Sequence, residues 1–113
     1  MIHEMKLQPE YYNFILNGTK RIEIRLFDEK RQQIKIGDTI KFLKEPELNE
    51  SFEAKVVGLL RYNSFKDMFN DFDISVLSDK SMTKDELIDV LEEFYTKEKQ
   101  TKYGVLGIRI ELM

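Results

Sequence analysis

The segment Asn17-Gly18-Thr19-Lys20-Arg21-Ile22-Glu23-Ile24-Arg25-Leu26 carries the strongest structural signal in this chain. Its opening Asn-Gly pair is a typical helix stop, and the apolar residues that follow recur at every second position, as in a strand with one buried face. Strict alternation assigns Arg21, Glu23 and Arg25 to the other face. Three charges on one strand face are either solvated or the wall of a binding site. The glycine turn before them and the basic pair Lys30-Arg31 after them favour a site.

The composition is that of a soluble globular protein of 113 residues, 42% hydrophobic and 35% charged. We therefore expect a single domain over residues 1–113 with one modest core. The chain has no cysteine, which excludes disulfides, thiolate nucleophiles and cysteine-based zinc sites. Its one histidine, His3, argues against a histidine-rich metal site or a Ser-His-Asp triad. Neither a metal ion nor a cofactor is expected.

The distribution of charge favours a small ligand over a long nucleic acid. No apolar run is long enough to span a membrane, and the N-terminus lacks the features of a signal peptide, so a cytoplasmic protein is expected. The net charge of −3 argues against a DNA duplex as partner. Residues 20–31 hold five positive and three negative charges, whereas residues 66–98 hold ten acids and four lysines. One side is therefore expected to be basic and another strongly acidic, and the basic side is expected to bind a small anionic or nucleotide-like ligand.

Hydrophobic alternation predicts strands over residues 3–7, 20–26, 39–43, 51–62 (with a bulge or bend at Gly58) and 103–112. Helices are predicted between Pro9 and Asn17, from Ser64 through Phe69, and from a Thr83–Glu86 capping box to Tyr95. Residues 71–81 and 97–102 are predicted to be irregular. The order β-α-β-β-β-α-α-β favours an antiparallel or mixed sheet curled into a small barrel, with a flat α+β sandwich left open.

Three blocks together resemble the ASCH domain family: Gly18–Arg25, Ile36–Phe42 and Lys102–Ile108. The resemblance runs from Leu7 to Ile110, and its specificity lies in the order and spacing of the blocks. It implies a bacterial protein with a PUA-like fold, which is mainly β with short helices (α+β) in a small curled barrel. It also implies a relationship to RNA-binding PUA domains and a cleft beside the Gly-x-Lys-x-x-Glu-x-Arg strand.

Some small bacterial members of this family are implied to be amidohydrolases that deacetylate N4-acetylcytidine. Their pattern has a lysine, a threonine three residues later, and a glutamate near the start of a helix in the second half. Lys20 matches the lysine, but Glu23 stands in place of the threonine. The glutamate position falls near Lys80, with Asp79 and Asp85 close by. This departure weakens the case for acetylcytidine hydrolysis, so the sequence leaves open whether the protein is a hydrolase of a modified nucleoside or of RNA, or no enzyme at all.

The candidate site residues in the motif have distinct expected roles. Lys20 is expected to contact an anion or, in an enzyme, to act as a general base or nucleophile, with Glu23 orienting it or a water molecule. Arg25 is expected to contact a phosphate or a base edge, while Glu23 accepts a hydrogen bond from an exocyclic amine. Alternation places Lys20 and Glu23 on opposite faces, so they share a pocket only if the strand is irregular at its start.

Five further residues outside the motif are candidates for ligand or RNA contact. Lys30 and Arg31 can bind backbone phosphates from their loop. Tyr62 can stack on a base or belong to the core. Ser64 is a helix cap or, without a histidine partner, a poor nucleophile, and Tyr103 begins the last strand beside a glycine that permits close approach. A protein-interaction domain that uses the acidic helix is a further alternative, which exposure of Phe94, Tyr95 or Leu106 would favour.

Overall fold

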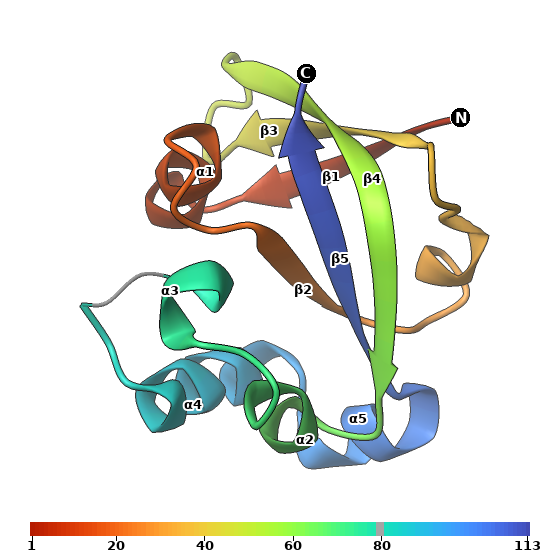
Figure 1. Ribbon diagram of the computed structural model, residues 1–113, viewed down its shortest axis with the longest axis vertical. Helices are drawn as coiled ribbons and strands as arrows, with labels where there is room; N and C mark the ends of the chain where they lie inside the picture. Colours follow the sequence, from red (N-terminus) through yellow and green to blue (C-terminus); the bar gives the residue numbers. More distant parts are fainter. Residues whose placement is uncertain (79–80) are drawn as a thin grey trace.

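The alternating apolar residues form strands that pair into one strongly curled sheet. A computed structural model describes residues 1–78 and 81–113, and within these ranges the sheet has five strands in the order β1-β3-β4-β5-β2. The strands are β1 (Ile2–Leu7), β2 (Ile22–Leu26), β3 (Thr39–Lys44), β4 (Ser51–Tyr62) and β5 (Val105–Leu112). Only β1 and β3 are parallel among these pairs. The sheet curls into a half-barrel, which confirms the expected fold (Figure 1).

The helices occupy the connections between strands. They are α1 (Pro9–Leu16), a 3₁₀ turn η1 (Arg31–Gln33), α2 (Phe65–Phe69), α3 (Ile74–Leu77), α4 (Lys84–Phe94) and α5 (Lys97–Tyr103). Helix α1 joins β1 to β2, the two edge strands, while α2 to α5 gather at one end of the half-barrel (Figure 1). Among the described residues, none of these helices has the length and apolar character that crossing a membrane requires.

The core has two parts, one on each side of β2. The first fills the inside of the curl with side chains from β1, β3, β4, β5 and α1, including Phe42, Val56 and Ile108. The second packs the apolar face of β2 against α2, α3 and α4, with Phe65, Met68 and Leu87 among its members. Strand β2 is therefore covered on both faces, and its polar residues point toward the protein interior. This arrangement positions the candidate site.

Local signals in the sequence explain several element boundaries. The Ser64 hydroxyl accepts a hydrogen bond from the Asp67 amide and caps α2. Thr83 and Glu86 form the predicted capping box at the start of α4. The register of β4 against β5 shifts between Val56 and Gly58, where a bulge or bend was predicted.

Three parts of the predicted element order are wrong. Residues 97–102, predicted as a loop, belong to helix α5, which is polar on nearly all sides and so lacks an apolar stripe. Residues 71–81, predicted as irregular, contain α3, a single turn capped by Asp73. Strands β2 and β5 are shorter than predicted, because they begin at Ile22 and Val105 and not at residues 20 and 103. Compared with the predicted order, the observed order has two more helices, α3 and α5, and the 3₁₀ turn η1 between β2 and β3.

Candidate ligand-binding cavity

A cavity of about 320 Å³ lies at the open edge of the half-barrel, between β1, β2 and α4. Small-molecule sites usually measure ~300–1,000 Å³, so this volume suits a single base or nucleoside. The walls are mainly apolar and aromatic, with Leu7, Tyr11, Ile24, Leu91 and Phe94 among the lining residues. The cavity also contains the three charged residues of the sequence motif: Lys20, Glu23 and Arg25.

Lys20 lies in an irregular segment just before β2, which is the condition for Lys20 and Glu23 to face the same pocket. Its amide donates a hydrogen bond to the Phe14 carbonyl oxygen at 2.9 Å, so it does not belong to the β2–β5 ladder. The side chain is 3% exposed and its Nζ donates to the carbonyl oxygens of Ile22 and Leu77, each at 2.6 Å. Nζ also lies 3.6 Å from Glu23 Oε1. Lys20 therefore ties the end of α3 to the start of β2.

Glu23 and Arg25 form an ion pair on the interior face of β2. Glu23 Oε2 accepts hydrogen bonds from Arg25 Nε at 3.1 Å and Nη2 at 2.8 Å. Glu23 Oε1 accepts from the Ile24 amide at 3.0 Å. Arg25 Nη2 also donates to the Lys6 carbonyl oxygen at 2.9 Å, so this side chain bridges the gap between the edge strands β2 and β1.

Burial and mutual attraction together set the charge of these three groups. Burial lowers the pKa of Lys20 to about 8, although the Glu23 carboxylate opposes the shift. Burial would raise the pKa of Glu23, but the cations Arg25 and Lys20 outweigh it and hold that pKa below its ordinary value. Burial would likewise lower the pKa of Arg25, but Glu23 and the Tyr95 phenol outweigh it and raise that pKa. At neutral pH two cations and one anion leave the cavity floor with a net charge of +1.

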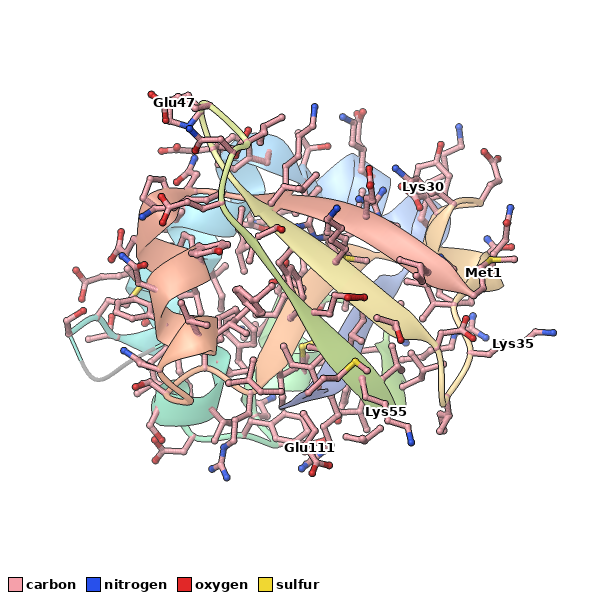
Figure 2. The ribbon with its side chains drawn as sticks, turned by 90° about the horizontal axis from the view of Figure 1, so that it is seen from above. Met1, Lys30, Lys35, Glu47, Lys55 and Glu111 are labelled. Atoms are coloured by element: carbon pink, nitrogen blue, oxygen red, sulfur yellow. The ribbon has the colours of Figure 1, made fainter. Side chains whose placement is uncertain are left out.

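The remaining predicted site residues lie outside this cavity. Lys30 is exposed on the side of the molecule opposite α1 (Figure 2). Arg31 forms an ion pair with Asp28, its Nη1 3.1 Å from Oδ2. Tyr62 and Tyr103 line a separate groove at the end of β4, next to α5.

The other members of the site hypotheses are also dispersed. Ser64 lines a third hollow beside α4 and α5, which shares no lining residue with the cavity. Asp85 lies in that hollow too, and the expectations placed on Asp79 and Lys80 fall outside the described residues. No group of three or more potential metal-ligating side chains occurs in the described part of the chain.

The sequence did not indicate the walls of the cavity as ligand contacts. Phe94, at the end of α4, is 55% exposed, and Tyr11 reaches the cavity from α1. Exposure of Phe94, Tyr95 or Leu106 was expected to favour a protein-interaction domain. Leu106 is buried and Tyr95 is half-buried, so Phe94 is the exposed residue of the three. An exposed aromatic at a helix end is a weak signal, and it gains meaning only because the fold places it beside the motif.

Comparison with known proteins establishes the family. Residues 5–113 match the profile of the ASCH domain, which covers almost the whole chain. The chain therefore belongs to the ASCH domain family, and the resemblance noted from its motifs is confirmed. None of the curated proteins is similar enough to the chain to count as a match.

Solved structures show the same fold. The hypothetical protein PH0355 is 41% identical over the full length of both chains, with a TM-score of 0.87. PF0455 from Pyrococcus furiosus is 39% identical over 100% of this chain and 98% of its own, with a TM-score of 0.80. Both are archaeal, whereas the resemblance implied a bacterial source. The ASCH protein from Zymomonas mobilis is 10% identical over 97% of this chain and 66% of its own; its TM-score of 0.65 indicates a shared fold alone.

Proposed function

We propose that this chain is a single ASCH domain that binds RNA or a nucleotide-like ligand, with one base held in the cavity between β1, β2 and α4. The observation that carries the proposal is the buried Lys20–Glu23–Arg25 cluster, which gives a small, mostly apolar cavity a floor of net charge +1. A base offers a flat apolar ring for the aromatic walls and an acceptor atom for Arg25. Stacking on exposed aromatic side chains is the usual way in which unpaired bases are held.

Binding by the wild-type protein and two arginine variants tests the proposal. Arg25→Ala removes a donor from the cavity, whereas Arg21→Ala removes the same charge from an exposed neighbour outside it. Charged hydrogen bonds contribute roughly 1.5–3 kcal/mol, so Arg25→Ala is expected to weaken binding of single-stranded RNA by about tenfold or more. Fluorescence anisotropy with labelled RNA measures the affinities, and circular dichroism checks folding. Equal affinity in a folded Arg25→Ala protein, or equal losses in both variants, contradicts the proposal.

A rim variant tests the aromatic part of the site independently. Phe94 is largely exposed, so Phe94→Ala removes a stacking surface with little effect on the core. Base–aromatic stacking contributes ~1–3 kcal/mol per base, and the expected loss of affinity is again about tenfold. Unchanged binding would remove Phe94 from the site and leave Tyr11 and Tyr95 as the stacking candidates.

One observation favours a second candidate function, hydrolysis at a modified nucleoside such as N4-acetylcytidine, or of RNA. Burial lowers the pKa of Lys20 to about 8, in the range where a lysine can serve as a general base. Against this, its three ammonium protons face Ile22 O, Leu77 O and Glu23 Oε1, all within the protein. Incubation with N4-acetylcytidine and with single-stranded RNA, beside a Lys20→Ala control, distinguishes the two functions. Turnover that the control lacks would establish the enzyme; no turnover, or equal turnover in both, would reject it.

A further inference from the structure

The buried carboxylate of the cavity has no remaining capacity to accept a hydrogen bond. An ionised carboxylate has about four lone-pair positions. Oε1 of Glu23 meets the Ile24 amide and the Lys20 ammonium, and Oε2 meets two nitrogens of Arg25. The exocyclic amine of a base would therefore find no free acceptor on Glu23, contrary to the role expected from the sequence.

Lys20 is committed to the protein in the same way, which leaves Arg25 as the source of free donors. Nε and both N–H groups of Nη2 are used by Glu23 and by the Lys6 carbonyl oxygen. Across the described ranges, no hydrogen bond of ordinary geometry uses Nη1. The Tyr95 phenol lies beside the guanidinium and can accept from one N–H, so at least one N–H of Nη1 is left for a ligand.

The rest of the cavity favours a flat neutral ring. Most of the side chains around the charged floor are apolar or aromatic. The two other charged lining residues, Lys6 and Glu45, are of opposite sign, so together they add no net charge. A ring that directs a carbonyl oxygen at Arg25 satisfies the free donor. A ring that directs an amine there places two hydrogen-bond donors next to each other, so the amine and the Arg25 N–H both remain buried without an acceptor.

We propose that the cavity selects a heterocycle that presents a carbonyl oxygen to Arg25, as uracil does, over one that presents an amine, as cytosine does. This selectivity rests on the proposed function, because it concerns the same cavity. Uracil and cytosine are matched in size, and in a strand both carry a 2-carbonyl next to the sugar-bearing N1. The far edge of the ring is the part that can reach the cavity floor, and there uracil has a 4-carbonyl and a proton on N3, whereas cytosine has a 4-amine and an unprotonated N3. The wild-type protein is expected to bind uracil-containing strands about tenfold more tightly or better.

The experiment compares short oligouridylate and oligocytidylate strands of equal length, measured by fluorescence anisotropy at one pH and salt concentration. Arg25→Gln replaces a group that only donates with an amide that both donates and accepts, so the affinity ratio between the strands is expected to fall close to one. Arg21→Gln, at an exposed position outside the cavity, is expected to keep the wild-type ratio. Partial unfolding lowers both affinities alike and leaves the ratio unchanged, so a folding defect cannot imitate the result.

Each outcome has a definite meaning. A tenfold preference for oligouridylate that disappears in Arg25→Gln and persists in Arg21→Gln supports the selectivity. Equal affinities in the wild-type protein, a preference for oligocytidylate, or a preference that survives Arg25→Gln overturns it while leaving the binding function intact. Failure of both strands to bind overturns the proposed function and the selectivity together.

Discussion

The Glu23→Gln substitution tests whether the buried cluster stabilises the fold through charge. Glutamine has the same shape and can still accept hydrogen bonds, but it removes the one anion between two buried cations. The side chains of Lys20 and Glu23 are 3% and 6% exposed, and that of Arg25 is 12% exposed, so water screens them little. The variant therefore carries two uncompensated positive charges in the protein interior.

The structure indicates the size of the effect. Glu23 lies 3.6 Å from Lys20 Nζ and 2.8 Å from Arg25 Nη2. With an effective dielectric constant of about 20, each attraction is roughly 5 kcal/mol. Desolvation of the carboxylate offsets several kcal/mol of their sum, which leaves about 3–5 kcal/mol for breaking the cluster. For a protein of this size the midpoint of thermal unfolding is expected to fall by roughly 12–20 °C.

Equilibrium unfolding in urea measures the loss, and a double variant identifies its cause. Lys20→Met combined with Glu23→Gln returns the net charge of the cluster to +1. If charge is the cause, the double variant is more stable than the sum of the two single losses predicts. A loss below about 1 kcal/mol for Glu23→Gln, or strictly additive losses, would refute the electrostatic account.

Three further changes have expected outcomes. The folded pKa of Lys20 is lowered to about 8 from 10.5, so the unfolded state binds more protons between these values and stability rises with pH. Urea unfolding at pH 7.5 and 9.5 is expected to show a gain of about 2 kcal/mol that Lys20→Met lacks; equal pH profiles would contradict the lowered pKa. Thr83→Ala removes the hydroxyl that caps α4 by accepting a hydrogen bond from the Glu86 amide at 3.1 Å. The free energy of unfolding is expected to fall by about 1 kcal/mol in the same assay. Unchanged stability would mean that the cap contributes nothing. Gly104→Ala is expected to cost more than Gly18→Ala, although both glycines have positive φ, because its Cβ would lie 3.3 Å from the Tyr62 carbonyl oxygen whereas Gly18 has open space. Equal losses in thermal unfolding would show that the close contact relaxes freely.

Interactions between residues close in the sequence explain why most element boundaries could be predicted. The Thr83 cap and the Ser64 cap each join residues three apart, so the sequence contains both partners. Helix α5 was missed because its residues are polar on nearly every side. Two local signals could have revealed it: Thr96, which caps its first turn, and Gly104, which ends it with φ +75.

The sequence by itself determined the family, the curled sheet with its helical connections, and the motif whose charges lie together. Only the tertiary structure decided that these charges are buried. Lys20 is held by the Leu77 carbonyl oxygen, 57 residues away, and Arg25 by the Lys6 carbonyl oxygen across the open edge of the sheet. Alternation along a strand predicts which side chains share a face, but it carries no information about what covers that face. The cover comes from the far edge of the sheet and from α4, and packing between distant segments is what turns a charged strand into a cavity.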